Sequence, residues 1–352
     1  MEFGFTAEQT QLRDTVRSFL DRHVDSERVR AADGFDAALW RRLADEVGLA
    51  ALVVPEEQGG FGASQVEAGV VLEEAGRALV PAPLLSTLVT TAAIDPNLAP
   101  ELLTEIAQGK AIAALAVAEP DDVDPSATRC VAHPDGDGYR IHGIKEHVLD
   151  GQVADLVVVS AVCDGRPGLY AVRTEDAVRT PHDTLDLTRR QARLEFDAAP
   201  AVRVGTDPDR AWNVLWAALA VESVGVARAS LEQTIEYMKT RRQFGVPLAH
   251  FQALRHRVAD LFTMVEAATS SAWYALRVAH TAEFSVAAPL AKLVATRAAY
   301  AVTAESIQLH GGIGFTWEHD AHLYFKRATA NRLLFCDEVR LRQVIAARAE
   351  LF

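Results

Sequence analysis

The N-terminal part of the chain carries apolar residues at the spacing of amphipathic helices. The run 12–20 places its apolar side chains on one helical face, and Thr6 with Gln9 forms a capping box ahead of it. A second helix is expected over about 36–48, and another after the capping box at 64–67. These patterns predict an N-terminal domain that is helical throughout.

From residue 111 the pattern changes to short apolar runs that are rich in β-branched residues. Runs such as 156–159 and 169–172 are separated by turn-forming segments such as 134–136 and 166–168. Short strands joined by Gly and Pro turns are typical of a small β-barrel or sandwich. The strand pattern continues to about residue 204.

Long helical patterns return after Pro208. Their approximate extents are 211–241, 250–282, 287–310 and 320 to the end. Four long helices with short links predict an antiparallel bundle. The predicted fold class is therefore α+β. Its expected domains are an N-terminal helical domain (1–110), a middle β-barrel domain (111–205) and a C-terminal four-helix bundle (206–352).

Composition and charge narrow the protein class. Of the 352 residues, 49% are apolar and 24% charged, as in ordinary globular proteins. The formal charge of −13 argues against nucleic-acid binding, which needs a basic surface. The three cysteines show no metal-ligand spacing and indicate a reducing setting. With no signal peptide and no apolar run of membrane-spanning length, we expect a cytoplasmic protein without a membrane partner.

The segment 240–245, Thr-Arg-Arg-Gln-Phe-Gly, places two cations and an aromatic residue at the end of a helical pattern. Several cations crowd this part of an otherwise acidic chain: Lys239, Arg241, Arg242, Arg255 and Arg257. One interpretation is a site for a small anion, with Arg241 contacting a pyrophosphate through its planar fork. The alternative is an ordinary helix end, where cations and a glycine are favoured.

A second motif, Gln-Leu-His-Gly-Gly-Ile-Gly-Phe, occupies residues 308–315. Its glycines predict a tight turn between helices and leave a bare backbone that a ligand can approach closely. The turn is expected whether or not a ligand binds there.

Together with the continuation 246–256, these two motifs resemble the flavin-binding part of the acyl-CoA dehydrogenase family. The resemblance covers the whole chain in domain order and is most specific after about residue 213. It implies tetramers that hold FAD at subunit interfaces, an acyl-CoA substrate and a separate electron acceptor. It also implies a carboxylate base that removes the α-proton while the β-hydrogen leaves as hydride. The positions that match the family's cofactor-binding residues are Arg241, Phe244, Gln252, Gln308, Gly311 and Gly312.

The expected base is missing from both of its usual positions in the family. The glutamate just before the last helix corresponds to Cys336, and the alternative position on the bundle's first helix corresponds to about Leu215. A thiol with a pKa of about 8.5 is mostly protonated at neutral pH. The remaining catalytic candidates are Asp337, Glu338 and Glu222; for Glu222, a structural ion pair is the alternative role.

The β domain departs from the family as well. In the stretch that should contact the flavin ring, His147 and Leu149 replace a tryptophan and a threonine. His147 is a candidate proton donor or a loop histidine without function. The segment 119–122 keeps only part of the family's substrate loop.

Three hypotheses follow. The first is a base-lacking subunit of a heterotetrameric acyl-CoA dehydrogenase for a bulky acyl-CoA, resembling those of actinobacterial steroid side-chain degradation. A paralogous subunit would then carry the base. The second is a self-sufficient homotetramer with a relocated carboxylate. The third is a non-enzymatic FAD- or acyl-CoA-binding assembly subunit.

Overall fold

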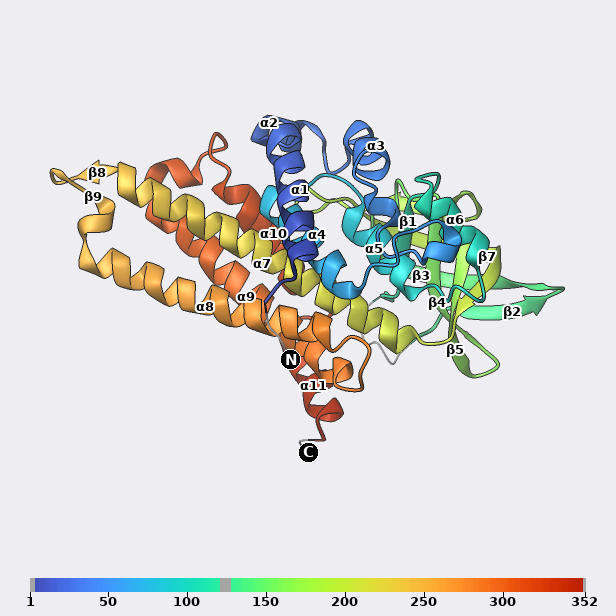
Figure 1. Cartoon of the computed structure of the whole chain (residues 1–352). Helices are drawn as coiled ribbons and strands as arrows, with labels where there is room; N and C mark the ends of the chain where they lie inside the picture. The colour runs from blue at the N-terminus through green and yellow to red at the C-terminus, as the bar shows by residue number, and fades with distance from the viewer. Residues whose placement is uncertain (1–3, 121–127, 351–352) are drawn as a thin grey trace. The chain divides into compact units, whose positions relative to one another are not determined.

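The computed structural model describes residues 4–120 and 128–350. Helices precede a set of strands, and further helices follow it (Figure 1). The first predicted capping box forms with Thr6 and Gln9. At the second, Glu67 accepts from the Ser64 N–H as predicted, while the Ser64 hydroxyl oxygen accepts from the Val66 N–H. The helices before the strands are α1 (Ala7–His23), α2 (Ser26–Ala31), α3 (Ala37–Asp45), α4 (Gln65–Ala78), α5 (Leu84–Ala93) and α6 (Pro100–Ala107).

The chain forms two compact units, which we call the helical unit and the barrel unit. The helical unit consists of Met1–Arg30, Gly69–Val80 and Trp216–Phe352. The barrel unit consists of Ala31–Ala68 and Pro81–Leu215. This grouping does not follow the three sequence domains, whose boundaries stay a prediction.

The strands of the barrel unit close on themselves. They are β1 (Ala113–Ala116), β2 (Val131–Asp135), β3 (Gly138–Leu149), β4 (Leu156–Cys163), β5 (Arg166–Arg173), β6 (Val178–Pro181) and β7 (Gln191–Gly205). Pairing runs in the order β4-β2-β3-β7-β5, and β5 pairs again with β4. Two further strands pair with strands of this barrel: β1 with β4, and β6 with β7. The predicted middle barrel is confirmed.

Long helices form the helical unit (Figure 1). They are α7 (Pro208–Thr240, from Trp216 onward), α8 (Gln252–Arg277), α9 (Phe284–His310), α10 (Ala321–Leu333) and α11 (Glu338–Arg348). Their shared core includes Val226 from α7, Val265 from α8 and Val302 from α9. Helices α4 and α7 touch backbone to backbone, because a Cβ added at Gly225 would lie 1.9 Å from the Glu73 carbonyl oxygen.

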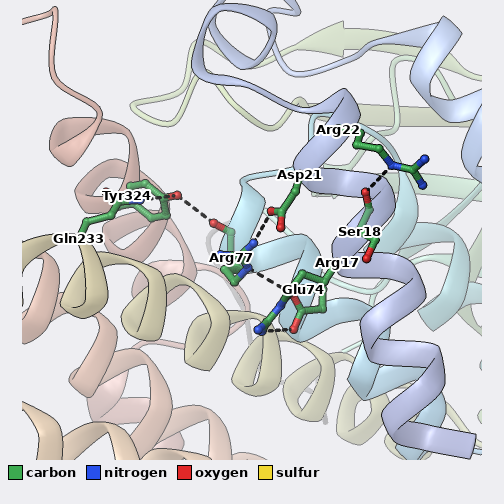
Figure 2. A network of polar contacts seen from close by, with 8 residues as sticks. All are labelled: Arg17, Ser18, Asp21, Arg22, Glu74, Arg77, Gln233 and Tyr324. Atoms are coloured by element: carbon green, nitrogen blue, oxygen red, sulfur yellow. Dashed lines mark hydrogen bonds and ion pairs between the residues drawn. The ribbon is translucent and has the colours of Figure 1, made fainter. Parts of the chain in front are cut away.

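Polar contacts tie the N-terminal helix to this bundle (Figure 2). Glu74 of α4 is buried and accepts two hydrogen bonds from Arg17 of α1, at 2.9 and 2.6 Å. Arg77 bridges Glu74 to Asp21, and its carbonyl oxygen accepts from the Tyr324 hydroxyl of α10 at 2.8 Å. The network therefore joins three helices that lie far apart in the sequence.

Two sequence predictions need correction. The pattern from 320 to the end is two helices, because the backbone leaves the helical angles at Leu334 and then takes a positive φ at Phe335 and Cys336 before α11 begins. The expectation that no run is long enough to span a membrane is also wrong for α7, which passes that test by length and composition. Its most apolar window is 94% buried inside the protein, as in the core helix of a globular fold.

Candidate functional site

The first sequence motif lies at an exposed end of the helical unit, where α7 gives way to a short hairpin. Strands β8 (Arg242–Gln243) and β9 (Val246–Pro247) form this hairpin, and Phe244 and Gly245 make its turn with positive φ. Phe244 is 93% exposed, and Arg241 is exposed beside it. A large aromatic ring and a guanidinium group therefore face solvent together.

The second motif reaches the same end of the unit. The Tyr237 hydroxyl, one turn before Arg241, donates a hydrogen bond to the His310 carbonyl oxygen at 3.2 Å. The two rings lie 4.4 Å apart between centroids. We call residues 241–252 with 308–315 the bundle tip. The structure thus brings together the two motifs that the sequence keeps far apart.

The bundle tip fits the nucleotide end of FAD. Gly311 has a φ of 64°, and a Cβ added at Gly311 or Gly312 would meet no atom within 4 Å. Bare backbone there faces open space, while Gln252 and Gln308 are exposed at the adjoining helix ends. Open backbone and a planar cation suit a pyrophosphate, which needs close approach and charge-assisted hydrogen bonds.

The turn between α10 and α11 holds the position of the missing base. Cys336 is fully buried, so its thiol does not face solvent. Both positive-φ residues of the turn accept a hydrogen bond from a buried side chain. Trp216 Nε1 donates to the Phe335 carbonyl oxygen at 2.8 Å, and Lys292 Nζ donates to the Cys336 carbonyl oxygen at 2.6 Å. Burial lowers the pKa of Lys292 to about 7. These contacts fix a backbone conformation that is otherwise costly for non-glycine residues.

The two carboxylates after Cys336 are engaged elsewhere. Asp337 is exposed and caps α11, accepting a hydrogen bond from the Arg340 N–H at 2.9 Å. Glu338 forms ion pairs with Arg342 at 2.7 Å and Arg332 at 3.4 Å. Both side chains therefore have structural partners.

Glu222 is 2% exposed and belongs to a buried polar cluster in the helical unit. Arg327 Nη1 lies 3.1 Å from one of its carboxylate oxygens, and Asn331 Nδ2 donates to the other at 2.9 Å. The ion pair that the sequence offered as the alternative role for Glu222 is present. The other base position, Leu215, is a buried apolar residue in the barrel unit.

The barrel unit presents a histidine pair where the family places flavin contacts. His147 has a φ of 54° and lies in a bulge of β3 against β7. Its ring stacks on His182 at 5.1 Å, and its Nδ1 is 3.1 Å from Gln191 Oε1. Leu149 is buried and brings no hydroxyl group. This surface therefore does not reproduce the family's contacts to the flavin ring.

The remnant of the substrate loop is only partly described. Glu119 is buried in an ion pair with Lys145, and its Oε1 also accepts from the Arg129 N–H at 3.1 Å. Asp121 and Asp122 lie outside the described residues. Glu119 therefore has structural partners inside the barrel unit.

Sequence reasoning missed Trp216 and Lys292, which hold the turn before α11. A lysine among the small apolar residues of 287–299 is a signal that was available, because such a charge needs a buried acceptor. Trp216 gave no comparable signal, since a tryptophan in a buried apolar helix is ordinary.

Comparison with known proteins places this geometry in a family. The model of the acyl-CoA dehydrogenase C-terminal domain matches residues 213–349, and that of the N-terminal domain matches residues 6–99. The acyl-CoA dehydrogenase IpdE2 of Mycobacterium tuberculosis (strain ATCC 25618 / H37Rv) is 40% identical over 327 residues, which cover 91% of each chain. IpdE2 of Mycolicibacterium smegmatis is 37% identical and covers 98% of this chain and 99% of its own.

Solved structures agree with this placement. The Tcur3481-Tcur3483 steroid ACAD superposes with a TM-score of 0.91 at 31% identity, covering 98% of both chains. The ChsE4-ChsE5 complex of Mycobacterium tuberculosis gives a TM-score of 0.90 at 26% identity, covering 99% of both chains. The family consists of FAD-dependent oxidoreductases. The chain belongs to the acyl-CoA dehydrogenase family.

Proposed function

We propose that this chain is the base-lacking subunit of a heteromeric acyl-CoA dehydrogenase. The observation that carries the proposal is the turn before α11, where a buried thiol replaces the family's carboxylate and Trp216 and Lys292 hold the backbone. The nearby acids, Asp337 and Glu338, are occupied as a helix cap and as an ion-pair centre. A paralogous subunit supplies the base.

Within the complex, the bundle tip holds the nucleotide end of FAD. The exposed Arg241 guanidinium binds the pyrophosphate, Phe244 packs against the cofactor, and the open backbone at Gly311 and Gly312 allows close approach. FAD, when bound, supplies the acceptor for the β-hydrogen as hydride. A carboxylate of the partner removes the α-proton, so the acyl-CoA becomes a 2,3-enoyl-CoA.

Two solved structures that resemble this chain support the heteromeric assignment and a bulky substrate. The names of the ChsE4-ChsE5 and Tcur3481-Tcur3483 structures each give two different chains. The Tcur3481-Tcur3483 structure is described as a steroid ACAD. We therefore propose a steroid-type acyl-CoA substrate. We also propose a cytoplasmic site of action, supported by three cysteines that are all free.

Purification of the chain alone and with its partner tests the proposal. The tagged chain is produced singly and together with each paralogous acyl-CoA dehydrogenase of its source that carries a glutamate at the position of Cys336. Flavin content and flavin reduction by acyl-CoA are then measured. We expect little flavin in the chain alone and a flavin-containing, active complex with one paralogue.

The other outcomes select the alternatives. A lone chain that is yellow and is reduced by an acyl-CoA establishes a self-sufficient homo-oligomer. Flavin or acyl-CoA binding without turnover in any combination establishes a non-enzymatic assembly subunit.

A further inference from the structure

Three arginines from three helices surround one carboxylate on the surface of the helical unit. Arg342 of α11 lies 2.7 Å from Glu338, Arg332 of α10 lies 3.4 Å away and Arg297 of α9 lies 3.8 Å away. Three cations against Glu338 and the adjoining Asp337 leave this surface with a charge of about +1, counted at the ordinary charge states of Arg, Asp and Glu. The whole chain carries a formal charge of −13, so this is a local reversal of sign.

The three guanidinium groups are only partly covered by contacts within the fold. The side chains of Arg297, Arg332 and Arg342 are 54%, 37% and 58% exposed. Exposed ion pairs contribute little to stability, and a second and third cation on one carboxylate also repel each other. The guanidinium groups retain exposed surface with which to meet further acceptors.

The cluster borders exposed apolar side chains and a hollow. Leu333 and Val339 are 63% and 65% exposed. A cavity of about 720 Å³ adjoins them. It is lined by Arg332, Leu333, Asp337, Glu338, Val339, Arg342 and Gln343. Large exposed apolar residues beside arginines are the composition of protein interfaces, in which arginine is enriched and lysine depleted. We call Arg297, Arg332, Arg342, Leu333 and Val339 the arginine face.

One side chain of the arginine face, that of Arg332, is held in place by aromatic residues. The Arg332 guanidinium lies 4.7 Å above the Tyr300 ring, and Tyr300 packs against Phe325 at 5.5 Å between centroids. Stacking on an aromatic ring restricts a side chain that would otherwise lose much rotamer entropy on binding.

We propose that the arginine face docks the paralogous acyl-CoA dehydrogenase subunit, through an acidic patch that carries exposed apolar side chains. The inference rests on the proposed function, which supplies the partner. Charge complementarity favours this occupant: in a two-fold symmetric contact a second copy of the chain would bring its own arginines to the same area, whereas an acidic surface would neutralise them.

Charge reversal tests the inference on the full-length chain. The variant Arg297→Glu/Arg342→Glu is compared with Arg42→Glu/Arg140→Glu. The side chains of Arg42 and Arg140 are 37% and 44% exposed, and each pairs with one carboxylate of the barrel unit. Affinity for the paralogue that forms the active complex is measured by surface plasmon resonance at low and physiological salt. We expect the first variant to raise Kd about tenfold or more and to flatten its salt dependence. The control variant should match the wild type.

A second variant, without added negative charge, shows whether misfolding explains the effect of the charge-reversed variant. Arg297→Gln/Arg342→Gln removes the cations without adding carboxylates beside Glu338, and it should weaken association in the same direction with an unchanged circular dichroism spectrum. If a paralogue forms an active complex but binds the wild type and both arginine-face variants with equal affinity, the inference is overturned and the proposed function stands. Weakened self-association of the lone chain, with no paralogue bound, would overturn both.

Discussion

Replacing Glu222 by alanine is expected to lower the free energy of unfolding of the helical unit by about 3–5 kcal/mol. The substitution leaves the Arg327 guanidinium buried without its carboxylate partner, and the Asn331 amide loses an acceptor. Urea unfolding, followed by the fluorescence of buried tryptophans such as Trp216, measures the change. An effect below about 1 kcal/mol would show that the pair is not a buried ion pair in solution.

A double substitution separates this structural role from catalysis. Glu222→Leu/Arg327→Met removes both charges and fills the site with apolar groups of similar size, so it should recover most of the lost stability. Turnover of the assembled complex carrying the double variant should match the wild type. A stable double variant that has lost turnover would instead make Glu222 a catalytic base.

Replacing Arg241 by alanine is expected to weaken flavin binding by the assembled enzyme about 10- to 150-fold. The range corresponds to about 1.5–3 kcal/mol for a hydrogen bond to a charged group. Flavin retained after desalting, and its dissociation constant by titration, measure the loss. The exposed position of Arg241 at the bundle tip makes a general effect on folding small.

Lys239→Ala provides the matched control for Arg241. Lys239 is a cation on the last turn of the same helix, but its ammonium group is bound to Glu236 at 2.6 Å. It should leave flavin content unchanged. Equal flavin loss in both variants would reduce the effect to general electrostatics, and undiminished flavin in the Arg241 variant would contradict its assignment to the pyrophosphate.

Local signals predicted the elements of this fold well. The capping contacts at 6–9 and 64–67 are formed by side chains a few residues apart, so sequence spacing alone fixes them. The closure of the barrel could not be predicted in this way. The pairing of β5 with both β4 and β7 depends on contacts between distant segments, which the local pattern of apolar residues does not show. The break between α10 and α11 was missed because its turn places Phe335 and Cys336 at positive φ, which is ordinarily the property of glycine.

The same distinction applies to the site. The two motifs of the bundle tip were readable as motifs, but their meeting through Tyr237 and His310 was not. The partners of Glu222, and two of the three arginines beside Glu338, come from other helices. Whether either carboxylate is available to act as a base therefore depended on the tertiary structure. A single sequence shows which acids exist, and packing decides which of them are already engaged.

In the proposed complex we expect no carboxylate of this chain to act as the base of the reaction. This is checked by the steady-state turnover of the preassembled complex with Asp337→Asn or Glu338→Gln in this chain, and with glutamine for the partner's glutamate at the position of Cys336. Asparagine still caps α11, so the fold is kept. We expect turnover within about twofold of wild type for both variants of this chain and a loss of about 10²- to 10⁴-fold for the partner's variant. A comparable loss from Asp337→Asn or Glu338→Gln, with the partner's substitution tolerated, would contradict it.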